Sequence, residues 1–213
     1  MSKEHSGEFS GNDLSRNEKA RDLCNEWERQ IAKYLKLGFH KQLGLTIEEY
    51  MASIPGFQLP SGNLMEYFNR LLLVEPRIPS QKQLRLAGYK YSVRGTAIDN
   101  VITDTNPYVV LLQDGSKKEL GDPAGPDERC VTLQEGASLL LSYPEILDSH
   151  PVVILGSTVF SFEGNEVQRT LPCIYRWSDD KIGIGSDHIG YLADYGAKPA
   201  TCAVISKNST LLM

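Results

Sequence analysis

The sequence contains no apolar run as long as the roughly 18 uninterrupted residues that a membrane-spanning helix needs. Its first residues, MSKEHSGEFSGND, also lack the apolar core that is typical of a signal peptide. These two absences predict a cytoplasmic protein that has no membrane partner.

The chain also has no excess of basic residues over acidic ones. The chain carries 22 lysines and arginines against 27 aspartates and glutamates, which gives a formal net charge of −5. Proteins that bind nucleic acids normally present a basic patch to the phosphate backbone. We therefore expect no nucleic-acid partner, and we expect the acidic balance to favour solubility.

Cysteine is scarce, and its spacing does not suit a metal centre. The four cysteines form no C-x-x-C pair and have no histidine close to them in the sequence. Structural zinc sites normally use short, paired spacings. The sequence therefore predicts free thiols, no metal and no cofactor. A metal site that the fold assembles from distant residues is the alternative, and its ligands would be Cys130, Cys173, Cys202 and His188.

Motifs for catalysis and for nucleotide binding are absent as well. No G-x-S-x-G nucleophile elbow and no H-E-x-x-H zinc motif occurs. The glycines of DKIGIGSDHIGYLADYG (180–196) do not form the G-x-G-x-x-G of a dinucleotide fold. Gly185 and Gly190 have P-loop spacing, but Tyr191 and Leu192 follow where that loop requires lysine and serine or threonine. Both nucleotide interpretations are therefore excluded.

What is present indicates an ordinary globular protein. Of its 213 residues, 41% are hydrophobic and 23% are charged, which suits a chain with a sizeable core. We predict a disordered tail over 1–12 and a single α+β domain over 13–213. Its N-terminal part, 13–60, is helical, and 61–213 is rich in strands. The predicted fold has N-terminal helices followed by a largely antiparallel β-sheet with an inserted helix.

Four patterns mark the beginnings of helices. In each, serine or threonine is followed three residues later by glutamate or glutamine, the spacing of a capping box. The pairs are Ser15–Glu18, Thr46–Glu49, Ser80–Gln83 and Thr132–Glu135. The first pair predicts a helix over 15–37 that ends before Gly38. Leu23, Trp27 and Ile31 recur every four residues and form its expected packing face.

Apolar and β-branched runs between these helices predict strands. The runs are RLLLVEP (70–76), PYVVLLQ (107–113), PVVILGSTVFSFEGNEVQRTLPCIYRW (151–177) and TCAVIS (201–206). The third run is long enough for two or three strands, with turns near Gly156 and Gly164.

A hairpin explains the glycine-rich stretch better than a nucleotide loop does. We predict that 181–186 pair antiparallel with 171–177 through a turn at 178–180, because Ser-Asp-Asp is favourable in turns. Gly183 and Gly185 then leave one face bare, where another backbone or a flat ring such as that of Trp177 can lie close. Gly185 is therefore expected to be a packing residue.

Three motifs in the C-terminal half resemble those of a known family. They are a helix start with a following Y-P-E-x-L, an R-x-L-P-x-I strand and a K-I-G strand with a histidine turn. Here these read TLQEGASLLLSYPEIL (132–147), VQRTLPCIYRW (167–177) and KIGIGSDHIGYLA (181–193). The chain thereby resembles a family of uncharacterised bacterial cytoplasmic proteins, known as a domain of unknown function.

The resemblance extends over about 40–205 and includes LGLTIEEYMASIP (43–55). It implies a fold and a bacterial origin, and it assigns neither catalytic residues nor a ligand. The chain departs from the family pattern at Gly185, where a bulky or sulfur-bearing residue is expected, and in a longer stretch after His188.

The sequence leaves three classes of function open. The first is a binding or interaction module for a small molecule or a protein. Its expected ligand-binding residues cluster near the C-terminal hairpin: Arg176, Trp177, Asp187, His188 and Tyr191. A simpler alternative makes Trp177 a core residue and pairs Arg176 with a surface carboxylate.

The second class is a hydrolase-like enzyme in which Asp187 and His188 lie near Arg176. Such an enzyme requires all three side chains in one pocket, together with a nucleophile or an activated water. The third class is a structural or assembly subunit, for which a large exposed apolar patch would be the signal.

Overall fold

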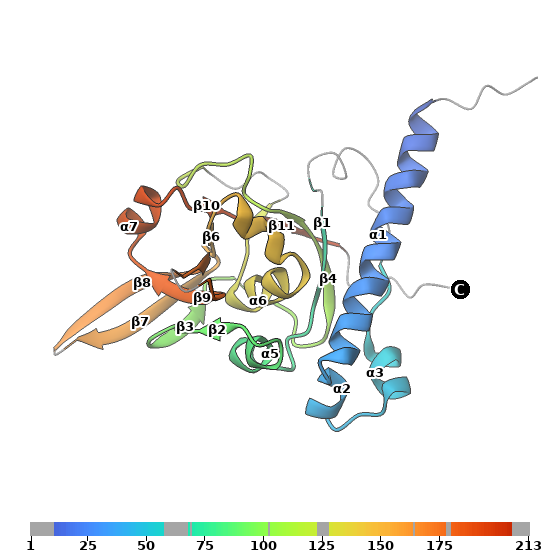
Figure 1. Ribbon diagram of the computed structural model, residues 1–213, viewed down its shortest axis with the longest axis horizontal. Helices are drawn as coiled ribbons and strands as arrows, with labels where there is room; N and C mark the ends of the chain where they lie inside the picture. Colours follow the sequence, from blue (N-terminus) through green and yellow to red (C-terminus); the bar gives the residue numbers. More distant parts are fainter. Residues whose placement is uncertain are drawn as a thin grey trace, which may run out of the picture.

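The computed structural model describes residues 11–57, 68, 70–101, 103–122, 128–163, 165–177 and 180–205, and it shows an α+β fold (Figure 1). The helices are α1 (Gly11–Lys36), α2 (Phe39–Gln42), α3 (Ile47–Ser53), α5 (Ser80–Leu86), α6 (Leu133–Ser142) and α7 (Ile189–Asp194), with the 3-10 helix η1 (Pro144–Asp148). The strands are β1 (Arg70–Val74), β2 (Lys90–Tyr91), β3 (Thr96–Asp99), β4 (Tyr108–Gln113), β5 (Arg129–Cys130), β6 (Val152–Val153), β7 (Ser157–Glu163), β8 (Glu166–Arg176), β9 (Ile182–Asp187), β10 (Lys198–Pro199) and β11 (Thr201–Val204). The predicted fold class is confirmed.

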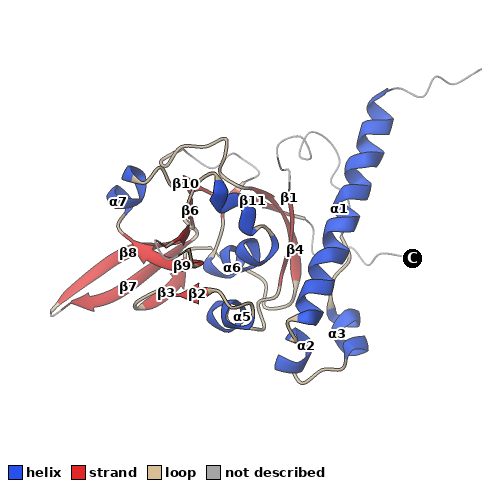
Figure 2. Ribbon diagram, viewed as in Figure 1, coloured by secondary structure: helices blue, strands red, loops and turns tan. Residues whose placement is uncertain are grey.

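The strands form two sheets, whereas the sequence predicts one. The four-stranded sheet has the order β1-β4-β11-β5 and is antiparallel throughout. The larger sheet contains β10-β6-β8-β7-β3, with β9 paired to both β8 and β2. Only its β10–β6 and β2–β9 pairs are parallel among the strand pairs of the described residues. Figure 2 shows the two sheets on either side of α6.

The four-stranded sheet is covered on both faces, which explains the uninterrupted apolar run of β1. Side chains alternate between the two faces along a strand. Leu71 and Leu73 belong to the core beneath α1, whereas Leu72 and Val74 belong to the core that contains α6. A strand covered on one face only would alternate apolar with polar residues.

Helix α1 also satisfies the backbone of β1, which lies at the edge of its sheet. The side-chain amide of Gln30 donates to the Leu71 carbonyl (2.7 Å) and accepts from the Leu73 N–H (2.8 Å). The hydroxyl of Tyr34 donates to the Leu73 carbonyl (2.7 Å), and that of Tyr143 donates to the Leu71 carbonyl (2.6 Å). These bonds cover an edge that would otherwise be open to pairing with another chain.

The bounds of α1 differ from those that the sequence predicts. The helix begins at Gly11, so Ser15 lies inside it and the predicted capping box at Ser15 is wrong. Residues 11 and 12, which the sequence places in the tail, belong to the helix, and 1–10 lie outside the described residues. The predicted stop is confirmed, because α1 ends at Lys36 and Gly38 has a φ of 77°.

The packing face of α1 is centred further along the helix than its spacing pattern indicates. Of the three residues predicted for this face, Ile31 is buried, whereas Leu23 and Trp27 are only partly buried. Tyr34 is fully buried, and its ring stacks on Phe39 with centroids 4.5 Å apart. The end of α1 nearest to α2 therefore carries most of the contact with the sheet.

Two of the four predicted capping boxes are formed. Thr46 and Glu49 cap α3, and Thr132 and Glu135 cap α6. The box predicted at Ser80 is wrong, because Pro79 is the N-cap of α5 and the Ser80 hydroxyl donates to Gln134 instead. The side chain of Gln83 is buried and donates to two carbonyl oxygens of the preceding loop. Tertiary partners thus replace the local cap.

None of the helices in the described residues combines the length and the apolar character that a membrane span requires. In the same part of the chain, no three side chains of histidine, cysteine, aspartate or glutamate gather as metal ligands would. Cys173 and Cys202 belong to different hydrophobic clusters, so the fold separates two ligands of the alternative metal site.

Candidate functional site

The predicted C-terminal hairpin is present and forms one wall of the candidate site. Strand β9 pairs antiparallel with β8, from Leu171 opposite Asp187 to Arg176 opposite Ile182. Asp180 has a φ of 60° in the connecting turn, a conformation that aspartate tolerates better than most residues. Residues 178 and 179 of the predicted turn lie outside the described residues.

Both glycines of β9 are packing residues, as the sequence predicts, and each accommodates a different neighbour. A Cβ atom at Gly183 would lie 2.0 Å from the carbonyl oxygen of Lys90, so the backbone of β2 approaches closely there. A Cβ atom at Gly185 would lie 2.6 Å from the Tyr175 hydroxyl and 2.9 Å from Cε1 of its ring. The ring over Gly185 is therefore that of Tyr175, whereas the sequence suggested Trp177.

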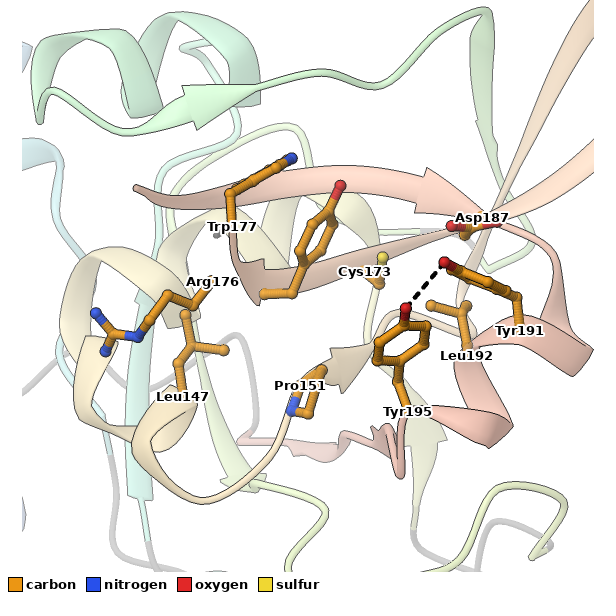
Figure 3. A pocket seen from close by; sticks show the side chains of 10 residues that line it. Leu147, Pro151, Cys173, Arg176, Trp177, Asp187, Tyr191, Leu192 and Tyr195 are labelled. Atoms are coloured by element: carbon orange, nitrogen blue, oxygen red, sulfur yellow. Dashed lines mark hydrogen bonds between the residues drawn. The ribbon is translucent and has the colours of Figure 1, made fainter. Parts of the chain in front are cut away.

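A cavity of about 580 Å³ lies against this hairpin, and the other walls come from α7, from η1 and from the segment that joins η1 to β6 (Figure 3). The lining residues are Leu147, Pro151, Cys173, Tyr175, Arg176, Trp177, Asp187, Tyr191, Leu192 and Tyr195. Aromatic and apolar side chains dominate the lining, and within the described part of the chain its charged groups are Arg176 and Asp187. This composition is typical of sites that bind small molecules.

The fold brings together four of the five residues that the sequence predicts for the site. Arg176, Trp177, Asp187 and Tyr191 line the cavity, and His188 does not. His188 is exposed and serves as the N-cap of α7, without a hydrogen bond from its side chain to the helix. Its backbone N–H donates to Oδ1 of Asp187 (2.8 Å). The helix itself is not predicted by the sequence.

Arg176 occupies one end of the cavity and has a partner of its own. Its guanidinium donates to Oδ1 of Asp148 (2.9 Å), and both side chains are largely exposed. In Figure 3 the guanidinium lies beside Leu147 and points away from Asp187. The alternative in which Arg176 pairs with a surface carboxylate is therefore confirmed, although the side chain still contributes to the cavity wall.

Aromatic rings line the cavity in two pairs. Tyr175 and Trp177, from the end of β8, have ring centroids 3.9 Å apart. Tyr191 and Tyr195, from α7 and the residue after it, have centroids 4.7 Å apart, and their hydroxyls share a hydrogen bond of 2.9 Å. The ammonium of Lys90 lies over the Trp177 ring, 4.5 Å from its centroid. Trp177 is thus partly buried in the site and not in the main core.

Asp187 provides the negative charge of the cavity. The described residues include no cationic side chain paired with this carboxylate, which accepts a hydrogen bond from the His188 N–H. Burial, and secondly the charge of Asp187, raise the pKa of the Cys173 thiol to about 12. Burial likewise raises the pKa of Tyr175, with a smaller contribution from Asp187. The centre of the cavity is therefore apolar, and the charge of Asp187 acts on the groups that line it.

Several lining residues have no clear signal in the sequence. Leu147 and Pro151 lie before the start of β8 at Glu166, and only the folded chain places them beside the hairpin. Tyr195 was detectable in principle, because it follows Tyr191 by four residues and this spacing places two side chains on one helical face. That signal is visible only once α7 is assigned as a helix.

We expect the cysteines to differ widely in reactivity. Thiolates react with Ellman's reagent, and the thiolate fraction falls tenfold for each unit by which a pKa rises. Cys24 is exposed on α1, whereas Cys173 is buried and has a raised pKa. At neutral pH, Cys173 should react at least about 100-fold more slowly than Cys24.

Stopped-flow absorbance of the folded and of the denatured chain tests this difference. One thiol should react rapidly in the folded chain, and Cys24→Ser should remove that phase. A fast phase that persists in Cys24→Ser and disappears in Cys173→Ser would contradict the assignment of Cys173 as an unreactive thiol.

Comparison with models of protein families, with curated proteins and with solved structures finds no match for this chain. The interpretation of the cavity therefore rests on the residues that line it, on their charges and on the elements that hold them in place.

Proposed function

We propose that this protein is a binding module whose ligand, a small molecule or the side chain of a protein, occupies the cavity between the β8–β9 hairpin and α7. The observation that carries the proposal is the volume of about 580 Å³ combined with an aromatic lining and two charged groups. Ligand sites typically have volumes of about 300 to 1,000 Å³ and a few polar groups among apolar walls.

The geometry favours binding over hydrolysis. A hydrolase of the class considered above needs Arg176, Asp187 and His188 in one pocket with a nucleophile. His188 lies outside the cavity, and Arg176 is paired with Asp148. Among the described residues, the lining includes no serine, threonine or histidine, and Cys173 is kept protonated by its raised pKa. No observation on the described residues therefore favours the enzyme.

The setting that we propose for this module is the bacterial cytoplasm, and the proposed ligand is not a nucleic acid. The acidic net charge of −5 supports the second point, since a polyanion would be repelled. The resemblance to a bacterial family of unknown function, carried by 132–147, 167–177 and 181–193, supports the first.

A fragment screen on a Trp27→Phe variant tests the proposal. The chain has two tryptophans, so this change leaves Trp177 as the single reporter, and Trp177 lines the cavity. Fragments that bind the cavity should change its emission. Tyr195→Ala should weaken them at least tenfold, because truncated aromatic contacts commonly account for most of a binding energy.

Phe162→Ala is the matched control, because Phe162 is another exposed aromatic side chain, lies on β7 and does not line the cavity. This variant should bind the same fragments within about twofold of the parent. If no fragment alters Trp177 emission, or if Tyr195→Ala and Phe162→Ala behave alike, the cavity is not a binding site.

A further inference from the structure

We infer that the cavity takes an organic cation, whose charged group lies at Asp187 beside the Tyr191–Tyr195 pair and whose apolar body extends toward Tyr175. This inference rests on the proposed function and adds the class and the orientation of the ligand. It depends on three observations: the unpaired carboxylate, the exposed tyrosine pair beside it, and the charge pairs at the opposite end.

The first observation is the state of Asp187. Its side chain is half-buried, it faces the cavity, and among the described residues no lysine, arginine or histidine forms an ion pair with it. A carboxylate has about four lone-pair directions, and the His188 N–H uses one of them. A partly desolvated anion with free acceptor capacity is a site for a cation.

The second observation is the aromatic surface beside this carboxylate. Tyr191 is 52% exposed and Tyr195 is 62% exposed, although the two rings pack together. Figure 3 shows both hydroxyls turned toward the Asp187 end of the cavity. The faces of aromatic rings attract ammonium groups, and clusters of aromatic rings are a recurring means of binding organic cations. A bound cation would cover the tyrosine surface that is otherwise in water.

The third observation fixes the orientation of the ligand. At the far end of the cavity, Arg176 is paired with Asp148, and Lys90 already lies over the Trp177 ring. The positive charge of Lys90 at that end repels a ligand cation, and the pairing of Arg176 with Asp148 leaves little attraction for an anion. The cation is therefore directed to Asp187.

The middle of the cavity suits an apolar ligand body. Cys173 and Leu192 are buried members of one small hydrophobic cluster, and Tyr175 packs against it. None of the charged side chains that the structure describes lies in this cluster. A flat or branched hydrocarbon group there would gain free energy from burial without losing a hydrogen bond.

Three probes that share one ring and differ in charge test the inference: benzylammonium, benzyl alcohol and benzoate. Each is titrated into the Trp27→Phe chain while Trp177 emission is followed. Benzylammonium should bind at least tenfold more tightly than benzyl alcohol, and benzoate should bind weakest. This comparison needs no change at Asp187, so it does not depend on how well a variant folds.

The Asp187→Asn variant then tests whether the carboxylate of Asp187 is the group that binds the cation. Asparagine keeps an oxygen that can accept from the His188 N–H, so the turn is preserved. Benzylammonium should bind Asp187→Asn at least tenfold more weakly, whereas benzyl alcohol should be unaffected. Asp194→Asn removes the same charge from α7 at an exposed position outside the cavity, and it should change either affinity by less than about twofold.

The outcomes separate the inference from the proposed function. If benzyl alcohol binds as tightly as benzylammonium, or if Asp187→Asn leaves the cation affinity unchanged, the cavity binds ligands but the cation assignment is wrong. If benzoate binds more tightly than benzylammonium, the charged contact is with Arg176, and the cation assignment is wrong. If none of the three probes alters Trp177 emission, the proposed function fails together with the inference.

Discussion

Glu135→Ala should lower the free energy of unfolding by about 3 to 5 kcal/mol, because it removes one partner of a buried ion pair. The Glu135 side chain is fully buried at the start of α6. Its carboxylate forms a two-pronged ion pair with Arg129, accepts from the Tyr108 hydroxyl (2.8 Å) and accepts from the Thr132 N–H (2.8 Å). Alanine would leave all three donors without this acceptor, and two of them, on Tyr108 and Thr132, are buried.

The exposed capping box of α3 provides a matched control. Glu49 occupies the same position relative to Thr46 that Glu135 occupies relative to Thr132, and it accepts the same backbone bond (2.8 Å). It is exposed, so Glu49→Ala should cost only about 0.5 to 1 kcal/mol. Equilibrium unfolding in urea measures both variants. Equal losses would show that the network around Glu135 adds nothing to the local cap.

Gly183→Ala should lower the free energy of unfolding by about 3 kcal/mol, near the upper end of what overpacking usually costs. The added Cβ would lie 2.0 Å from the Lys90 oxygen, 2.7 Å from its carbonyl carbon and 2.9 Å from its Cα. All three are backbone atoms of β2, so no side-chain rotation relieves the overlap. The β2–β9 pairing must open or shift.

Two further glycines of the segment 180–196 provide comparisons for this loss of stability. Gly185→Ala should cost about 1 kcal/mol, because its neighbour is the end of the Tyr175 side chain, which can move. Gly190→Ala should be neutral or stabilising by about 0.5 kcal/mol, since Gly190 lies in α7 with nothing within 4 Å of an added Cβ. Unfolding in urea should rank the three variants in this order, and a loss at Gly190 equal to that at Gly183 would contradict it.

Local patterns in the sequence determined the elements whose signals need no distant partner. The capping boxes at Thr46 and Thr132, the apolar run of β1 and the hairpin of β8 with β9 are all present as predicted. In each case the physical cause lies within a few residues: a side-chain oxygen reaches a nearby N–H, or alternating side chains share one face. The packing role of Gly185 followed from the hairpin itself.

Wrong local predictions have one cause in common. At Ser80 the hydroxyl finds Gln134, 54 residues away, so a tertiary bond replaces the local cap. At Trp27 the apolar spacing is correct, but the part of α1 that meets the sheet is centred on Ile31 and Tyr34. Apolar spacing identifies which face of a helix is buried. It does not determine how much of the helix packs against a sheet.

The candidate site shows the same difference between what the sequence determines and what the tertiary structure decides. The sequence placed Arg176, Trp177, Asp187, His188 and Tyr191 in one neighbourhood because they lie within 16 residues of each other. Only the tertiary structure decided which of them share a cavity, because that depends on the walls contributed by Leu147, Pro151 and α7. It also paired Arg176 with Asp148 and left Asp187 without a cationic partner among the described residues. The sequence determines the sign of each side-chain charge. Whether that charge is neutralised depends on neighbours that only folding brings within reach.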